Sequence, residues 1–454
     1  MMSASATIAT ANRASVSEQS EEQKMVKKVA VSSFLGNFIE WFDYASYSYF
    51  ATTIALVFFP SGNHTVAMLQ TFGVFALSFV LRPIGALFWG NFGDKKGRKG
   101  ALAISIMFMS GASFLIGCLP SYAAIGIFAP ALLLLLRMVQ GFSASGEYAG
   151  AATFLGEYAP TSKRGIYCSL IPASTAIGLL VGSTLATVMT ASLSSDALTS
   201  WGWRIPFLMA GPLGLIVHFI RTKLADSPVY ASMTEALDDK QQFASTTKSV
   251  SPLRELFQNH FKTLVISFGA CVLNAVGFYT VLTYLPTYLS DTVGMAAAQS
   301  STITTICLVA YVFMVFGMGH ISDKFGRKKV LIGACVAFIV LTVPAFLILN
   351  TLPSSGPVLL VELAMCATLT ANDGTLSSYL TETFPTSVRF TGFAFSFNLA
   401  NAIFGGTAPF IATWLIYTTG SSIAPAWYMV AVAAVALVAM ILSHENTDKD
   451  LSRI

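Results

Sequence analysis

Long apolar segments, separated by shorter polar ones, dominate the pattern along this chain. A helix needs about 20 apolar residues to cross the hydrocarbon core of a bilayer, and twelve segments of about that length can be marked out. Their expected limits are 29–59, 67–92, 100–119, 125–156, 165–191, 203–221, 262–289, 299–321, 329–350, 356–381, 389–416 and 424–443. The pattern predicts an all-α polytopic membrane protein with twelve transmembrane helices.

The composition agrees with this class. Hydrophobic residues make up 54% of the 454 residues and charged residues 11%, whereas roughly a quarter of a soluble domain is charged. The six cysteines all fall in apolar segments, with no Cys-x-x-Cys and no Cys/His cluster. We therefore expect no disulfide, no metal site and no cofactor.

The basic residues predict the orientation. Of the 26 Lys and Arg residues, 23 lie in the tails or in the loops that follow even-numbered spans, and the opposite loops contain none. Basic loops favour the cytoplasmic side, so both termini are expected there. The first 28 residues precede a long span rather than a short signal-peptide core, which indicates a cytoplasmic tail.

The longest polar stretch divides the spans six and six. The predicted organisation is a tail (1–28), a six-helix bundle (29–221), a cytoplasmic loop (222–261), a second bundle (262–443) and a tail (444–454).

Two loop motifs occur once in each half. Gly90-Asn-Phe-Gly-Asp-Lys-Lys-Gly-Arg-Lys99 recurs as Gly319-His-Ile-Ser-Asp-Lys-Phe-Gly-Arg-Lys328, and Glu157-Tyr-Ala-Pro-Thr-Ser-Lys-Arg164 recurs as Glu382-Thr-Phe-Pro-Thr-Ser-Val-Arg389. The offsets are 229 and 225 residues, so order and spacing both match. Parallel repeats of six spans indicate two bundles that rock around a central cavity.

The first apolar segment carries two acids at membrane depth, where an ionisable group is costly and indicates function. Glu40, Asp43, Tyr44 and Tyr47 follow the i, i+3, i+4, i+7 spacing of one helix face. This face is expected to line a wet cavity.

A proton-coupled carrier needs a buried acid that gains and loses a proton, with a partner that responds to the change. Asp43 and Arg137 fit this requirement, because protonation of the acid would release the arginine; the alternative is a static ion pair that fixes helix packing. Glu147 is a second candidate for proton coupling or for binding a substrate ammonium group. Its alternative is a packing acid paired with a neighbouring helix.

Substrate contacts are expected from polar and aromatic residues of the spans. Arg82 can fork onto a substrate carboxylate, or else pair with Glu40 or Asp43. Glu40 can bind a substrate cation or belong to a structural network. The other candidates could equally be packing residues or interhelical hydrogen bonds; they are Tyr44, Tyr47, Gln140, Asn274, Tyr279, Tyr284, Asn398 and Asn401.

The repeated loops resemble the signature of the major facilitator superfamily over essentially the whole chain. More narrowly, Gly36-Asn-Phe-Ile-Glu-Trp-Phe-Asp43, Leu81-Arg-Pro-Ile-Gly85 and Trp201-Gly-Trp-Arg204 resemble the metabolite:proton symporter family. Leu282-Thr-Tyr-Leu-Pro-Thr-Tyr-Leu-Ser290 and Phe404-Gly-Gly-Thr-Ala-Pro409 look most like its proline/betaine branch, whereas Phe59-Pro-Ser-Gly-Asn63 resembles its 2-oxoglutarate branch. In sugar:proton relatives an Asp of the first span pairs with an Arg of the fourth, which matches Asp43 and Arg137.

The resemblance also implies that the repeated loops form cytoplasmic ion-pair latches, and we expect Asp373 to lie near that end as a further gate residue. The latch residues would be Asp94, Arg98, Glu157, Arg164, Asp323, Arg327, Glu382 and Arg389.

The sequence thus predicts a proton symporter of the bacterial inner membrane that imports a zwitterion such as proline or glycine betaine. The alternative is a di- or tricarboxylate such as 2-oxoglutarate or citrate, which would need more cavity cations than Arg82 and Arg137; a drug exporter is a third possibility. An enzyme would need a nucleophile–base pair, and a receptor would need a large soluble domain. The sequence shows neither feature, so neither class is expected. The expected partners are a small solute, protons and lipid, without nucleic acid, and the expected state is a monomer.

Overall fold

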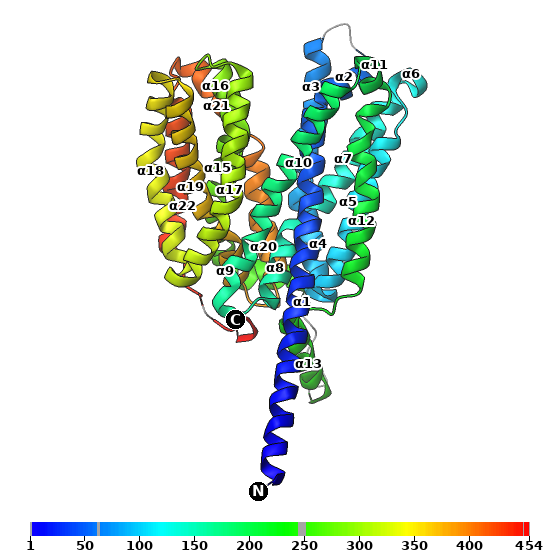
Figure 1. Ribbon diagram of the computed structural model, residues 1–454, viewed down its shortest axis with the longest axis vertical. Helices are drawn as coiled ribbons and strands as arrows, with labels where there is room; N and C mark the ends of the chain where they lie inside the picture. The colour runs from blue at the N-terminus through cyan, green and yellow to red at the C-terminus, as the bar shows by residue number, and fades with distance from the viewer. Residues whose placement is uncertain (1, 61–63, 244–250, 448, 454) are drawn as a thin grey trace.

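The protein folds into two helical bundles that stand side by side, as the computed structural model shows (Figure 1). The structure describes residues 2–60, 64–243, 251–447 and 449–453. Parts of the predicted tails and inter-bundle loop, namely residues 1, 244–250, 448 and 454, lie outside the described residues. Both chain termini lie at one end of the bundles, which we call the terminal end.

The first bundle runs from blue to green in Figure 1. Its helices are α1 (Met2–Tyr49), α2 (Ala51–Phe58), α3 (His64–Val80), α4 (Arg82–Lys96), α5 (Arg98–Cys118), α6 (Tyr122–Ile125), α7 (Phe128–Ala144), α8 (Glu147–Tyr158), η1 (Thr161–Lys163), α9 (Arg164–Cys168), α10 (Leu170–Ser192), α11 (Ser195–Ala197), η2 (Leu198–Gly202) and α12 (Arg204–Thr222).

The connection between the bundles contains α13 (Pro228–Phe243) and α14 (Pro252–Asn259). The second bundle comprises α15 (Phe261–Phe278), η3 (Tyr279–Tyr284), α16 (Leu285–Asp291), α17 (Ala297–Phe325), α18 (Arg327–Thr351), α19 (Ser355–Thr383), α20 (Arg389–Ala400), η4 (Asn401–Gly405), α21 (Ala408–Thr419) and α22 (Ala424–Leu442), and η5 (Leu451–Arg453) follows.

Ten of the helical segments in the described residues are long and apolar enough to cross a membrane by themselves. The other two expected spans are the first, whose apolar stretch contains Glu40 and Asp43, and the second, which is divided at Leu81 into helices of 17 and 15 residues. Pro83 stands in the first turn of α4. Because proline has no backbone N–H, it cannot continue the hydrogen bonds of the preceding helix, and a new helix begins here.

The repeated Gly-Arg step of the loop motif has a conformational cause. Gly97 and Gly326 each precede a helix, α5 and α18, with φ angles of 98° and 93°. Side chains other than glycine rarely adopt this region, so the glycine allows a sharp turn between consecutive spans in each half.

Candidate functional site

The carboxylate of Asp43 and the guanidinium of Arg137 meet inside the first bundle. Arg137 Nη1 donates to Asp43 Oδ2 at 2.8 Å, and both side chains are buried. Arg137 also donates to Gln140, whose amide donates to Ser113, and the guanidinium carbon lies 3.7 Å from the centre of the Tyr47 ring. The structure therefore brings together four of the predicted residues, from α1 and α7, around one buried ion pair.

A second pair lies one helical turn away. Arg82 Nη2 donates to Glu40 Oε1 at 2.7 Å, and the guanidinium carbon stands 4.9 Å and 4.7 Å from the ring centres of Tyr44 and Phe79. In this conformation Arg82 is thus paired with Glu40, which is one of the two alternatives that the sequence leaves open. Tyr279 of the second bundle packs against this group, and its ring centre lies 6.3 Å from that of Phe79.

Glu147 forms a third pair, with a residue that the sequence analysis did not single out. Arg221, in the last turn of α12, is buried and donates to both carboxylate oxygens of Glu147 and to the carbonyl of Leu102. Arg221 lies beside the long polar segment, where a basic residue at a helix end is usually solvated, so the sequence did not indicate a buried ion pair. This geometry favours the structural alternative for Glu147.

Asp373 does not join the repeated loops at the terminal end, near which it was expected, and its role in gating stays a prediction. Its carboxylate accepts hydrogen bonds from Asn274 and Tyr311, both at 2.5 Å, and lines a small pocket between the bundles. The reason is its position along α19. It precedes Glu382 by nine residues, or about 14 Å of helix at 1.5 Å per residue.

The remaining candidates are dispersed. Asn401 lines the same pocket as Asp373, and Asn398 donates across the bundle interface to the carbonyl of Ser145 at 2.8 Å. Tyr284 lies elsewhere, with its hydroxyl accepting from Thr413 at 3.2 Å. The hydroxyl of Tyr47 donates to the carbonyl of Thr71 at 2.9 Å.

At the terminal end, the repeated motifs join the two bundles. The carboxylate of Asp94 accepts the backbone N–H groups of Phe390 and Thr391 at 3.2 and 2.9 Å, at the N-terminus of α20, and the Thr391 hydroxyl at 2.6 Å. The equivalent Asp323 accepts the N–H groups of Gly165 and Ile166 at 2.7 and 3.0 Å, at the N-terminus of α9. An anion at a helix N-terminus is stabilised by the free N–H groups and the helix dipole.

Two glutamates are shared between arginines at the same end. Glu157 accepts from Arg98 of its own bundle at 3.2 Å and from Arg389 of the other bundle at 2.8 Å. Glu382 pairs in the same way with Arg327 and Arg164, at 3.3 and 3.0 Å. All eight predicted latch residues therefore converge in two pseudo-equivalent clusters that tie the bundles together.

Residues outside the repeated loops complete these clusters and were not predicted. The hydroxyl of Ser227 donates to Glu157, and Asp226 accepts the N–H of Arg98 at 3.1 Å. Asp226 lies outside the spans, and burial raises the pKa of its carboxyl group. Near the C-terminus, the carbonyl of Leu451 accepts from Arg389 at 3.0 Å.

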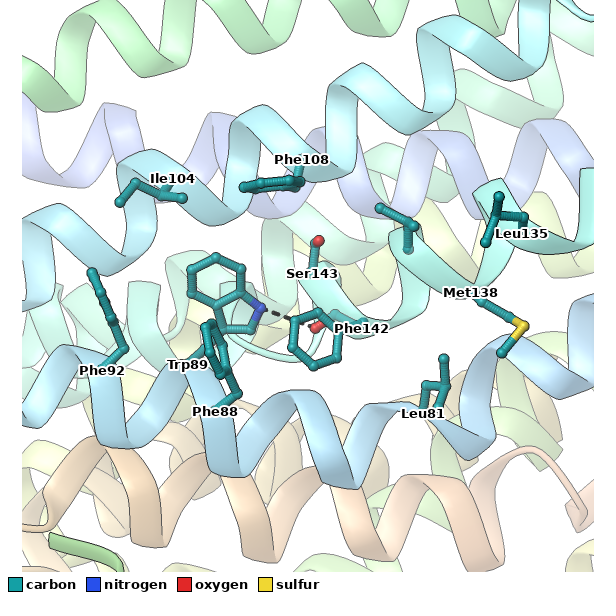
Figure 2. Close-up of a pocket in the computed structure, with 11 residues that line it drawn as sticks. Leu81, Phe88, Trp89, Phe92, Ile104, Phe108, Leu135, Met138, Phe142 and Ser143 are labelled. Carbon is teal, nitrogen blue, oxygen red and sulfur yellow. Dashed lines mark hydrogen bonds between the residues drawn. The ribbon is translucent and has the colours of Figure 1, made fainter. Parts of the chain in front are cut away.

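An apolar groove of about 460 Å³ lies apart from these groups, on the outer face of the first bundle between α4, α5 and α7. Figure 2 shows its lining, which includes Phe88, Phe108 and Leu135, with the Trp89 indole donating to the Phe142 carbonyl at 3.1 Å. The groove carries no ionisable side chain, so it does not suit a charged solute.

Comparison with known proteins identifies the chain. The profile of the family described as "Sugar (and other) transporter" matches residues 28–451. This chain belongs to that family, within the major facilitator superfamily. The transporter is 34% identical to the glycine betaine/proline/ectoine/pipecolic acid transporter OusA of Dickeya dadantii, over 94% of this chain and 85% of the relative. It is 35% identical to the ectoine/proline transporter ProP of Corynebacterium glutamicum, over 94% and 86%.

Solved structures of the superfamily share the fold. The proton:xylose symporter XylE, bound to 6-bromo-6-deoxy-D-glucose, superposes with a TM-score of 0.79 at 18% identity, over 95% of this chain and 98% of the other. FucP in the outward conformation gives a TM-score of 0.66 at 14% identity, over 92% and 97%. The comparisons confirm the predicted twelve-helix fold and superfamily, and they make this protein a multi-pass membrane transporter rather than an enzyme.

Proposed function

We propose that the transporter imports a small zwitterion that bears one carboxylate, such as proline, glycine betaine or ectoine, together with protons. The charge balance in the membrane supports this proposal most directly. The three acids of the first bundle that were proposed for proton coupling or substrate binding are each matched by one arginine: Glu40 by Arg82, Asp43 by Arg137 and Glu147 by Arg221. A di- or tricarboxylate would bring extra negative charge to a site whose arginines are already paired.

The second bundle supports the same conclusion. Between Lys262 and the end of α22, its Lys and Arg residues are confined to Lys324, Arg327–Lys329 and Arg389, all in the repeated loops. The pocket side of this bundle thus offers an acid, Asp373, and amides, but no cation for a second carboxylate. The names of the relatives, which include betaine, proline and ectoine transporters, agree with a zwitterionic solute.

The proton step is assigned to Asp43. When its carboxylate is charged, it holds Arg137 by an ion pair, and when a proton binds, the attraction is lost while Arg137 keeps its charge. Arg137 can then shift toward the solute carboxylate. The terminal end would face the cytoplasm, because the basic loops lie there. The Asp94 and Asp323 clusters would hold this end closed while the solute enters from the opposite side of the membrane. Because both bundles and every paired residue belong to one chain, a monomer would suffice.

Uptake into proteoliposomes tests this function. Labelled proline, glycine betaine, 2-oxoglutarate and citrate would be offered with an inside-alkaline pH gradient and again after a protonophore. We expect proline or glycine betaine to accumulate only while the gradient is present. Accumulation of citrate or 2-oxoglutarate in their place, or accumulation that survives the protonophore, would contradict the proposal.

A further inference from the structure

A small pocket between the two bundles is bordered by aromatic rings from both. Trp41 of α1 and Tyr148 of α8 come from the first bundle, and Phe278 of α15 and Phe397 of α20 come from the second. The rings of Tyr148 and Phe397 are stacked with centres 4.3 Å apart, and those of Trp41 and Phe278 have centres 5.1 Å apart. The pocket is therefore formed by both of the units that move in alternating access.

The carboxylate of Asp373 lies in the wall of this pocket and has neutral partners. Its two oxygens accept from the amide of Asn274 and the hydroxyl of Tyr311. Among the described residues, the ion pairs of the membrane region join other acids and none includes Asp373. A buried carboxylate is normally matched by a positive group, because burying an unpaired charge is costly.

Asp373 differs from the three acids of the first bundle, which are paired with arginines. Glu40, Asp43 and Glu147 each have a resident arginine, so a ligand cation would have to displace it. Asp373 needs no such displacement. Neutral donors orient its carboxylate toward the pocket without supplying positive charge.

We propose that this pocket binds the ammonium group of the transported solute, with Asp373 as its counter-ion and the rings of Trp41, Tyr148, Phe278 and Phe397 around it. The inference rests on the proposed function, since it takes the solute to be a zwitterion. Aromatic faces attract cations through their quadrupole, and a quaternary ammonium suits them because it has no N–H to be satisfied. The secondary ammonium of proline can in addition donate to the carboxylate. The pocket has a volume of only about 20 Å³ in this conformation, so the bundles would have to move apart to admit the ammonium group and could then close around it.

Calorimetric binding to the purified full-length transporter can isolate the contribution of the positive charge. The two ligands are glycine betaine and 3,3-dimethylbutyrate, which keeps the shape and the carboxylate but has carbon in place of the charged nitrogen. The test variant is Asp373→Asn, whose amide keeps the size of the side chain. The matched control is Glu362→Gln, a buried acid of the same helix that does not border the pocket.

We expect Asp373→Asn to weaken glycine betaine binding at least about tenfold, equivalent to about 1.4 kcal/mol, and to change binding of 3,3-dimethylbutyrate less than about threefold. Glu362→Gln should change neither ligand. Phe397→Leu, which removes one ring and leaves all charges in place, should weaken glycine betaine about threefold and spare 3,3-dimethylbutyrate, which lacks the positive charge. This second variant keeps the test decisive if Asp373→Asn folds poorly.

The possible failures can be told apart. If wild-type protein binds glycine betaine and both variants weaken the two ligands equally, or weaken neither, the ammonium site is refuted and the proposed function stands. If the wild type binds 2-oxoglutarate or citrate instead of glycine betaine and proline, both the function and the site are refuted.

Discussion

Gly90 sits where the two bundles touch, and replacing it by alanine tests how tightly the terminal end must close. A Cβ at this position would lie 2.5 Å from the Cα and 3.0 Å from the N of Thr391. Carbon atoms in ordinary contact are about 3.5–4 Å apart, so the first bundle and α20 would have to separate by about 1 Å. The obstacle is backbone, which cannot rotate away as the end of a side chain can.

The magnitude follows from this clash. Overpacking by one methyl group in a tight contact costs about 1–3 kcal/mol, and the separation also stretches the hydrogen bonds from α20 to Asp94. Because the contact is between bundles, the cost falls on the state with a closed terminal end, while each bundle keeps its own packing. A loss of about 2 kcal/mol would lower the ratio of closed to open protein about 30-fold, at 1.4 kcal/mol per factor of ten.

Spin-label distances measure that ratio. Labels would be placed at Lys95→Cys and Lys324→Cys, two exposed positions of the repeated loops, in a background with the exposed Cys118 changed to Ser. We expect Gly90→Ala to add a population with a longer distance. Gly111→Ala is the matched control, because a Cβ there meets nothing within 4 Å. If the two variants give the same distribution as the parent, the close contact does not govern closure.

Three further predictions concern single groups. Arg221→Gln should lower the stability of the solubilised protein by about 3–5 kcal/mol, because it leaves Glu147 buried without its partner, and Glu147→Gln added to it should restore most of the melting temperature; no recovery would show that the pair is not the cause. A membrane-impermeant maleimide should label Cys118 from outside intact cells, and labelling only after lysis would reverse the proposed orientation. Burial raises the pKa of Asp226 in the folded state above its ordinary value of 3.8. Its contribution to stability is therefore complete below pH 3.8 and is lost as the pH rises through the folded-state pKa. The melting temperature of the wild type relative to Asp226→Asn should fall over this range, and a constant difference would contradict the assignment.

Two features of the sequence carried most of what could be predicted. Segment length and basic loops indicated twelve spans, because the bilayer fixes the length of a helix and water excludes long apolar runs. The repeated motifs indicated two parallel halves, and the resemblance to the major facilitator superfamily implied that their loops meet at one end. Asp94 and Asp323 meet the opposite bundle in this way.

Contacts between helices were harder to predict because helical periodicity gives the phase of each helix but not its neighbours. Arg82 had two acids within plausible reach, and only the folded structure shows that its partner is Glu40. Arg221 stands at the limit of its predicted span, and nothing in the sequence shows that its side chain reaches back into the bundle to Glu147. The height of Asp373 in α19 follows from its nine-residue distance to Glu382 of the repeated motif, but its partners Asn274 and Tyr311 come from other helices and could not be predicted.

The central claim is that Asp43 carries the proton that drives uptake, and Asp43→Asn in proteoliposomes tests it most directly. Asparagine is neutral and imitates the protonated acid, so the variant should exchange internal for external labelled glycine betaine while failing to accumulate it against an imposed pH gradient. If the variant accumulates the solute to the wild-type level with unchanged pH dependence, Asp43 is not the coupling group and the account is contradicted.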